Sequence, residues 1–416
     1  RFDISILNSL TSSDIGIRGA ATGKVDLISP MTSKGILADM LCDSMYIADV
    51  PLGVLSLGSR WNEEEQNFEL FARNELDGQS NIDIEGKLSP KDKALDATLS
   101  MNRLKVDYAQ PFLADVFSEM SGQISGTITL DGPISNINIA SEDTRLENSL
   151  LRIEYTDVPY YADGPFHIDN SGVYFDTISI KDRFNGTGSV TGSINWDHFR
   201  DLSFNTHIRI NEIEGINLDE RAGEDFYGQV FGTGNVSITG PMNSIVLNVD
   251  AVTAKSGQLH IPLSSSATAG KVTNLLRFKQ EEVAVKIDPY EAMMTRLEAT
   301  ENADNDFTVK LRVNAHPEVE AFVEIDKASG NVLSGRGSGL IELEVGTDLF
   351  NINGDYTLNS GNYKFVAMGL VSRDFQIQDG SSIRFNGDIM ESTLNIDAIY
   401  QTKASISTLL SDLNSV

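Results

Sequence analysis

Polar and apolar residues alternate along much of this chain, which is the pattern of β-strands. In residues 95–101 every odd position is apolar and every even position is polar, and residues 202–210 alternate in a similar way. Because successive side chains of a strand point to opposite faces of the sheet, each segment has one apolar and one polar face. We therefore predict an all-β, mainly antiparallel fold in which consecutive strands pair. Turns are expected at dipeptides that favour them, namely Asp131-Gly132, Thr239-Gly240, Asn353-Gly354, Asp379-Gly380 and Asn386-Gly387.

One strand pattern recurs three times along the chain. It begins at Gly126, Gly234 and Gly339, and each copy continues with alternating apolar residues up to a further glycine. The copies lie roughly a hundred residues apart, and a fixed recurrence is typical of stacked structural units. We therefore predict an elongated, twisted sheet that is curled into a groove and contains a few short helices. Four regions are expected, over residues 1–120, 121–226, 227–306 and 307–416.

Three segments depart from the strand pattern. Apolar residues at helical spacing and an early proline predict one short helix over residues 108–120. A second short helix is expected over residues 218–226, again just before a copy of the repeat. Residues 264–305 contain polar runs and a charged tract, with a candidate helix over residues 271–279. Part of this insertion is expected to be mobile.

The charge balance and the single cysteine exclude several classes of protein. Sixty acidic and 32 basic residues give a formal net charge of −28, and such a surface repels nucleic acid and anionic lipid head groups. Cys42 is the only cysteine, so the chain can form neither an internal disulfide nor a cysteine-rich metal site. No apolar run reaches the roughly 18 residues that span a bilayer, and no signal peptide is recognisable. Because the chain begins at Arg1, we interpret it as part of a longer protein.

The sequence contains no recognisable signature of catalysis. Nucleophile elbows, zinc-protease helices and phosphate loops are all missing from it, and the histidines are scattered singly, at positions 167, 198, 207, 260 and 316. The tract Asp304-Asn305-Asp306 offers oxygen ligands for a hard cation such as calcium, although a solvated loop is the simpler interpretation. We therefore expect no enzyme activity, no catalytic residue, no metal site and no cofactor.

The apolar strand positions have a role that the alternation alone leaves open. They either fill a closed core between two sheets or line the open trough of a long sheet. The repeat favours the trough, because stacking similar units extends one apolar face along an axis. Such a lining is compatible with a bound phospholipid or detergent molecule. The candidate lining residues are Ile128, Leu130, Phe204, Ile208, Val236, Ile238, Val309, Leu311, Val313, Ile341, Leu343, Phe350, Ile352, Phe375, Ile377, Ile383, Phe385, Leu394 and Ile396.

From Val313 onward the chain resembles a known family. The matching residues include Pro317, Val319, Phe322, Val323, Ile325, Asp326, Gly330, Leu333, Gly335, Gly337, Gly339, Gly354, Tyr356, Gly361, Tyr363, Phe365, Phe375, Ile377, Gly380, Ile383, Phe385, Gly387, Leu394, Ile396, Ala398 and Tyr400. They resemble the C-terminal domain of the TamB family, within the AsmA-like group of bridge-type lipid transport proteins. Ser392-Thr393 departs from the proline that is frequent there, and the tail from Gln401 looks most like the Bacteroidota versions.

The resemblance implies a fold, a location and partners. It implies a periplasmic β-groove without catalytic residues, anchored in the inner membrane through an N-terminal segment that this chain does not include. It also implies that the last strands meet an outer-membrane β-barrel of the BamA/TamA type. Phospholipids are then the expected ligands, and nucleic acid is not a partner.

Three functions compete at this point. The first is a lipid conduit that carries phospholipid between the inner and outer membranes through an apolar groove, because acyl chains partition onto apolar surface without any covalent step. The second is an assembly factor that holds outer-membrane β-barrel precursors by strand-edge pairing. The third is an adhesin or a carbohydrate-acting solenoid, which would gather aromatic residues and carboxylates at one place; Trp61 and Trp196 instead lie in unrelated segments.

Overall fold

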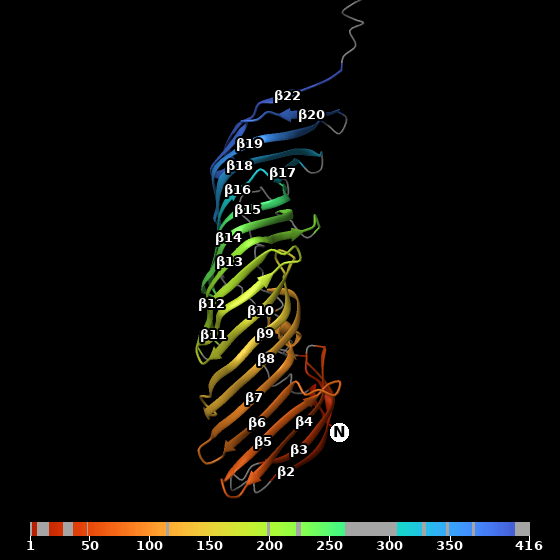
Figure 1. Ribbon diagram of the computed structural model, residues 1–416, viewed down its shortest axis with the longest axis vertical. Coiled ribbons are helices and arrows are strands. Elements are labelled where there is room, and N and C mark those ends of the chain that lie inside the picture. Colours follow the sequence, from red (N-terminus) through yellow and green to blue (C-terminus); the bar gives the residue numbers. More distant parts are fainter. Residues whose placement is uncertain are drawn as a thin grey trace, which may run out of the picture. The chain divides into compact units, whose positions relative to one another are not determined.

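The protein is almost entirely β-structure in the computed structural model. The structure describes residues 2–5, 16–27, 36–47, 49–113, 116–197, 200–221, 226–262, 306–326, 330–346, 349–367 and 371–403. Within these ranges the chain forms 22 strands. Its named helical segments, a 3-10 turn and a short α-helix, have four residues each. The all-β fold predicted from the alternation is confirmed (Figure 1).

The described residues belong to two compact units. The first contains Arg1–Glu214, Gly234–Val249 and Thr273–Val309, and the second contains Gly215–Thr233, Asp250–Val272 and Lys310–Val416. In chain order, the strands up to Leu218 are β1 (Phe2–Asp3), β2 (Arg18–Leu27), β3 (Ile36–Ile47), β4 (Val50–Asn62), β5 (Asn67–Glu75), β6 (Ile82–Ser89), β7 (Ala94–Lys105), β8 (Phe117–Pro133), β9 (Asn138–Ile153), β10 (Val158–Asp169), β11 (Gly172–Lys181), β12 (Thr187–Asp197) and β13 (Arg200–Leu218). The remaining strands are β14 (Tyr227–Pro241), β15 (Ser244–Pro262), β16 (Asp306–Ala315), β17 (Val319–Asp326), β18 (Asn331–Gly346), β19 (Leu349–Ala367), β20 (Val371–Ile377), β21 (Ser382–Asn395) and β22 (Ala398–Tyr400).

The first unit is an antiparallel meander. Each strand from β2 to β12 pairs with the next strand in the sequence, and β12 pairs with β13 in the same sense. Figure 1 shows these strands succeeding one another in the order of the chain, from red to green. Short connections are sufficient for this arrangement, because two antiparallel neighbours need only a hairpin between them. The predicted pairing of consecutive strands is confirmed here.

A small apolar core lies at the beginning of the first unit. Its buried residues come from the first strands and are Ile4, Ala21, Cys42, Met45 and Leu52. Tyr108 packs against this core and its hydroxyl donates a hydrogen bond to the Pro51 carbonyl oxygen over 2.8 Å. The 3-10 turn η2 (Val106–Ala109) and the short helix α1 (Gln110–Leu113) connect β7 to β8, and Tyr108 joins this connection to the core.

The helix predicted over residues 108–120 is wrong beyond Leu113. The chain is already in strand β8 from Phe117, where Phe117 faces Ile153 and Met120 faces Leu151 in the neighbouring strand. The register shifts between Phe117 and Glu119. This bulge changes the spacing of the apolar residues, so a strand imitates helical periodicity.

Bulges and close backbone contacts interrupt the long strands of the first unit. Register shifts occur in the β8–β9 pair, and Gly122 and Gly126 have φ angles of +123° and +137°. A Cβ at Gly126 would lie 2.5 Å from the Cα of Thr144, so only glycine fits there. The buried Thr144 hydroxyl donates to the Phe166 carbonyl oxygen. Such bulges increase the local twist of a sheet and bend its strands.

The second unit combines antiparallel pairs with one parallel pair. Strand β17 pairs antiparallel with β18, which pairs with β19. The long strand β19 then pairs with β21 along its first half and with β20 along its second half, and β20 pairs with β22. Strands β15 and β17 run parallel over Gly257–Pro262, which departs from the purely consecutive pairing that the sequence predicted.

Four of the five predicted turns lie within strands: Asp131-Gly132 and Thr239-Gly240 are near the ends of β8 and β14, and two others lie further inside their strands. Gly354 is within β19 and Gly387 is within β21, with φ angles of +133° and +98°. A Cβ at Gly354 would overlap the carbonyl oxygen of Leu340 in the next strand. The glycine therefore permits close strand approach rather than a hairpin. Asp379-Gly380 does form a turn, between β20 and β21.

The other predicted helices have different outcomes. Residue Leu218 ends strand β13 and a turn follows it, so no helix begins there; residues 222–225 lie outside the described residues. The insertion at residues 264–305, with its candidate helix, also lies outside them, as do Asp304 and Asn305. The four-region division stays a prediction.

Candidate functional site

One apolar row crosses the first unit from strand β3 to strand β13. Directly opposed residues of antiparallel strands project to the same face, so the registers place these side chains side by side. The step from β9 to β10 rests instead on a hydrogen bond between Ser141 and Ile168, because the register shifts between Pro165 and Asp169. Ser141 is the one polar member, and its hydroxyl accepts a hydrogen bond from the Ile168 amide over 2.7 Å. The first-unit row consists of Met40, Leu57, Ala72, Ile84, Leu99, Ile128, Ser141, Ile168, Val173, Ile194 and Phe204.

The opposite face of the same strands is polar. A second row of opposed residues runs through Arg60, Glu69, Lys87, Asp96, Asp131 and Asn138, and all six are exposed. Lys87 also bonds Glu65 over 2.6 Å, and Arg73 bonds Asp83. The strands of the first unit therefore separate an apolar face from a charged face.

The burial of the apolar row distinguishes an open face from a closed core. Every member of the first-unit row is half-buried. In a closed core between two layers such residues are almost completely buried, since protein interiors pack like crystals. Each side chain here touches its neighbours along the sheet but keeps part of its surface accessible. The first-unit row is thus an apolar surface that the rest of the chain covers only in part.

Four predicted lining residues lie on this surface. Ile128 is opposite Leu99, and Leu130 is opposite Ala97. Phe204 is opposite Ile194 and Ile208 is opposite Val190, on the same face of β13. All four are half-buried, as are Val236 and Ile238 on β14.

The second unit brings eight predicted lining residues onto one face. Leu343 is opposite Ile352, Val345 is opposite Phe350, and Tyr363 is opposite Phe375. The residues on this face are Ile341, Leu343, Phe350, Ile352, Phe375, Ile377, Ile383 and Phe385.

Strand β16 carries the next three predicted residues. Lys310 bonds Glu344 over 3.0 Å and Arg312 approaches Glu342 at 3.5 Å, so these even-numbered residues share the polar side of β18. The odd-numbered residues Val309, Leu311 and Val313 point to the other side of their strand and are half-buried.

Burial differs among the remaining members. Ile377 is only 4% exposed and fills an interior position under Gly361, whereas Phe350 and Leu394 are 43% and 62% exposed. Ile396 follows the end of β21 and is half-buried. The alternation places a residue on a face, but it does not fix how much the surroundings cover it. Whether these residues hold a lipid stays a prediction.

Aromatic residues replace the aliphatic ones where the second unit ends. A row of opposed residues crosses five strands there and consists of Val323, Leu333, Tyr363, Phe375 and Tyr400. The ring centroids of Phe375 and Tyr400 are 5.5 Å apart, and those of Tyr363 and Phe375 are 6.3 Å apart. We call these five residues the second-unit row. The strand alternation did not identify this concentration of rings.

Arg373 lies on the same face as the second-unit row. It is opposite Phe365, two residues before Phe375. Its guanidinium carbon is 4.8 Å from the centroid of the Tyr400 ring, and it donates a hydrogen bond to the Tyr400 hydroxyl. Hydrogen bonds from Thr402 and from Arg373 keep the pKa of Tyr400 below its usual value, because they favour the tyrosinate.

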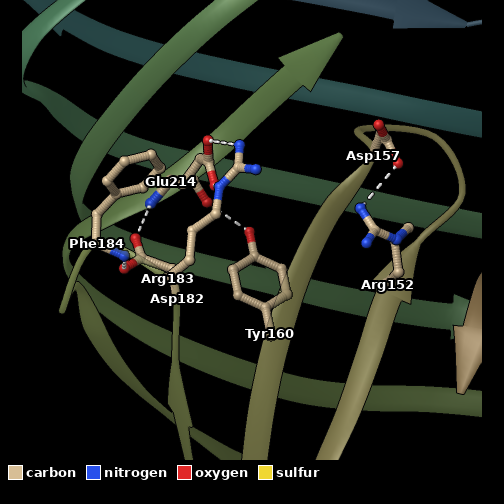
Figure 2. A network of polar contacts seen from close by, with 7 residues as sticks. All are labelled: Arg152, Asp157, Tyr160, Asp182, Arg183, Phe184 and Glu214. Atoms are coloured by element: carbon tan, nitrogen blue, oxygen red, sulfur yellow. Dashed lines mark hydrogen bonds and ion pairs between the residues drawn. The ribbon is translucent and has the colours of Figure 1, made fainter. Parts of the chain in front are cut away.

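An ion pair between the exposed Arg183 and the buried Glu214 fastens the loop between β11 and β12. Arg183 donates two hydrogen bonds to the Glu214 carboxylate, over 2.8 and 3.1 Å, and the Glu214 side chain is completely buried. Asp182 accepts from the amides of Phe184, Gly186 and Glu214 at 2.7 to 2.8 Å. Figure 2 shows these groups converging from neighbouring strands.

Tyr160 completes this network. Its hydroxyl donates to the Glu214 carbonyl oxygen over 2.7 Å, and burial followed by the nearby carboxylates of Glu214 and Asp182 raises its pKa. Arg152 forms a separate pair with Asp157 at 3.3 Å on the β9–β10 hairpin (Figure 2). The groups bond one another within the fold, so the network acts as a structural lock. Sequence reasoning missed it because its members lie far apart in the chain.

A second polar cluster occurs in the second unit. The His260 ring stacks between the rings of Tyr227 and Phe322, at centroid distances of 4.4 and 4.3 Å. Its Nδ1 atom is 3.2 Å from Oε1 of the buried Glu324, which also accepts a hydrogen bond from the Tyr227 hydroxyl. Burial, followed by the Glu324 carboxylate, raises the pKa of Tyr227. This cluster ties β14, β15 and β17 together.

The described residues contain no group of three or more histidine, cysteine, aspartate or glutamate side chains that could hold a metal ion. In the same ranges, no helix is long and apolar enough to cross a bilayer. His167 stacks on Tyr174, His207 lies on β13, and His316 lies in the connection between β16 and β17.

Comparison with known proteins adds a family to this geometry. The model of the TamB C-terminal domain matches residues 176–415, which is more than half of the chain. No curated protein and no solved structure matches the sequence.

Proposed function

Because the chain belongs to the TamB family, we propose that its apolar face carries the acyl chains of phospholipids between the inner and outer membranes. The family consists of non-enzymatic bridge and assembly proteins that act in outer-membrane assembly and lipid transport, which indicates a location in the cell envelope. Phospholipid is the specific cargo proposed here, and the periplasm is the proposed compartment. An outer-membrane β-barrel of the BamA/TamA type is the proposed partner.

The observation that supports this function is the half-buried apolar row on an otherwise acidic protein. Each methylene moved from water onto apolar surface gains about 0.8 kcal/mol. An acyl chain laid along the first-unit row would cover the exposed parts of Ile84, Leu99 and Ile128. The head group would stay in water beside the strands. The row therefore offers a lipid tail a continuous apolar environment.

The composition of the row suits movement rather than storage. It has no charged residue, and the Ser141 hydroxyl is already engaged with the Ile168 amide. A tail shifted by one strand meets side chains of similar size and polarity. Its free energy then changes little from place to place, and no single pocket traps it.

The test is a charge placed on the apolar face. We expect Ile128→Arg to lower the number of phospholipids bound per chain by at least about half, because an acyl chain cannot cover a guanidinium without dehydrating it. The protein should stay folded, since a half-buried arginine can extend its charged end into water. Native mass spectrometry after purification from a bacterial periplasm measures the lipid count, and circular dichroism measures folding.

The matched control places the same charge at Thr129, the residue that follows Ile128. Thr129 is also half-buried but projects to the polar side, opposite Thr98. Thr129→Arg should leave the lipid count unchanged. Equal lipid loss in both variants, or a folded wild-type protein that carries no lipid, would contradict the proposal. An unfolded Ile128→Arg protein would instead indicate a closed core.

The alternative function is assembly of outer-membrane β-barrel proteins. The short strand β22 pairs with β20 and its three residues are exposed. An exposed edge can add a further strand by main-chain hydrogen bonds. Crosslinks from β22 to a nascent barrel strand, combined with a lipid-free apolar face, would favour this function over lipid transport.

A further inference from the structure

Arg373 differs from the other strand arginines of the second unit in the face that it occupies. Arg384 bonds Asp355 over 2.6 Å, Arg336 bonds Glu320 over 3.1 Å, and Arg312 approaches Glu342 at 3.5 Å. These three lie on the polar side of their strands, each beside a carboxylate. Arg373 projects from the apolar side instead, opposite Phe365 and in line with Phe375.

The surroundings of Arg373 leave its charge uncompensated. In the described part of the unit no carboxylate forms an ion pair with it, although the chain has nearly twice as many acidic as basic residues. The neighbouring Asp374 is opposite Lys364, on the polar side. The partner of Arg373 is the Tyr400 hydroxyl, which occupies only one of the five N–H donors of a guanidinium.

Aromatic rings surround this charge on the same face. Tyr400, Phe375, Tyr363 and Phe365 form a chain of ring contacts at 5.5, 6.3 and 6.2 Å. Phe365 and Tyr400 are 39% and 38% exposed. Tyrosine, which has an apolar ring and a hydroxyl that can reach water, is typical of the boundary between acyl chains and head groups. The site therefore has an apolar part and a cationic part side by side.

We propose that Arg373 and the aromatic rings of Tyr363, Phe365, Phe375 and Tyr400 form a subsite for one glycerophospholipid, with its phosphate on the Arg373 guanidinium. The proposal rests on the lipid-carrying function proposed above and adds the place where a head group is recognised. A guanidinium binds a phosphate through two parallel hydrogen bonds. The acyl chains lie over the rings, and the second-unit row continues this surface to Leu333 and Val323.

The subsite also assigns a physical role to the phenol of Tyr400. Its hydroxyl accepts one guanidinium N–H and the ring lies under the cation. This contact orients the planar guanidinium while leaving donors for a ligand. A carboxylate in the same place would neutralise the charge and exclude a phosphate. The aromatic partner thus keeps Arg373 available for an anion.

The experiment compares two lipids that differ in the phosphocholine head group, which only one of them has. Dihexanoylphosphatidylcholine and dihexanoylglycerol have the same acyl chains and no net charge. They are titrated onto residues 1–416 after lipid removal, and native mass spectrometry follows the first bound molecule. Arg373→Ala should weaken the first phosphatidylcholine about tenfold, as expected for a charged hydrogen bond. The same variant should change dihexanoylglycerol binding less than about twofold.

Two further variants separate charge from geometry. Arg384→Ala removes an arginine of the same unit from the polar side and should leave both lipids bound as in the wild type. Arg373→Lys keeps the charge without the planar fork and should give an intermediate affinity for the phospholipid. Inorganic phosphate at the same concentration should neither bind nor compete, because it gains nothing from the rings.

The outcomes discriminate the subsite from the general function. Equal weakening of both lipids by Arg373→Ala, or equal weakening by Arg384→Ala, would overturn the subsite. So would competition by inorganic phosphate, which would mark a site for free anions. If the wild type binds both lipids and Arg373→Ala matches it, the subsite alone is wrong. A wild type that binds neither lipid would reject the lipid-carrying function itself.

Discussion

The two units present apolar faces of different chemistry. The first-unit row is aliphatic from Met40 to Ile194, has one engaged hydroxyl and ends at Phe204. The second-unit row changes to aromatic rings at Tyr363, and the same face bears the charge of Arg373. Both faces are made by the same strand alternation. The comparison shows that one sheet geometry can carry an aliphatic surface as well as a surface with a positive charge beside aromatic rings.

The difference follows from what each side chain offers to a lipid. Aliphatic groups interact with an acyl chain without direction, so they do not favour one position over another. A guanidinium bonds a phosphate in a defined plane, and aromatic edges tolerate water. We therefore expect lipid to move along the first-unit row and to be held in one orientation at the second-unit face.

The largest effect is expected from a glycine in the first-unit face. Gly192 lies between Phe175 and Thr206, has a φ of +119°, and a Cβ there would overlap the Asn205 carbonyl oxygen. Gly192→Ala should lower the free energy of unfolding by about 3 kcal/mol, through backbone strain and strand separation. Urea denaturation measures this loss.

A loop glycine provides the control for that substitution. Gly78 has a φ of +76°, and nothing lies within 4 Å of a Cβ built there. Gly78→Ala should cost only the conformational strain, about 1 kcal/mol. Equal losses at the two glycines would mean that strand approach in the first-unit face does not limit its stability.

A smaller effect is expected at the polar member of the first-unit row. Ser141→Ala removes the acceptor of the Ile168 amide hydrogen bond and should reduce the free energy of unfolding by about 1 to 2 kcal/mol. The number of bound lipids should not fall, because the substituted row is more apolar than before. Native mass spectrometry and urea denaturation measure the two quantities. Ser141→Thr keeps the hydroxyl and serves as the control; a drop in lipid count with Ser141→Ala would assign this hydroxyl to the ligand.

The smallest effect is a pH dependence of the second-unit face. The pKa of Tyr400 lies below its usual value, because hydrogen bonds from Thr402 and Arg373 favour the tyrosinate. As the pH rises through this pKa, the tyrosinate forms and competes with a phosphate for Arg373. Phosphatidylcholine binding should weaken about two- to threefold between neutral pH and about pH 10.

Tyr400→Phe removes the titrating group and leaves the ring in place. Its phosphatidylcholine affinity should stay constant over the same pH range, as should the affinity of the wild type for dihexanoylglycerol. A fall with pH that persists in Tyr400→Phe would attribute the effect to another group and would separate Tyr400 from the subsite.

The sequence predicted the strands better than their connections. Residues 95–101 and 202–210 are strands because their alternation has a single structural explanation when one face is apolar. The prediction of a helix after Tyr108 was wrong beyond Leu113, because a bulge near Phe117 gives the apolar residues of strand β8 a spacing that resembles that of a helix. The turn predicted at Asn353-Gly354 was wrong because glycine is favoured not only in turns but also where two strands approach closely.

The candidate site was also predicted only in part. The parity of Ile128, Leu343 and Ile352 was enough to place them on an apolar face. The difference between Ile377, which is buried, and Leu394, which is exposed, depends on what lies above each residue. Arg373 and Tyr400 are 27 residues apart and meet only through the pairing of β20 with β22. No local pattern reveals such a contact.

The sequence by itself determined the all-β class, the two-sided strands and the family, because side-chain alternation and the glycine pattern are local properties of the chain. The tertiary structure alone decided the registers, the parallel pairing of β15 with β17, the lock around Glu214 and the uncompensated charge of Arg373. These features depend on which strands become neighbours and on which bulges shift their alignment. A shift of one residue moves a side chain to the other face of the sheet, and only the folded chain fixes that choice.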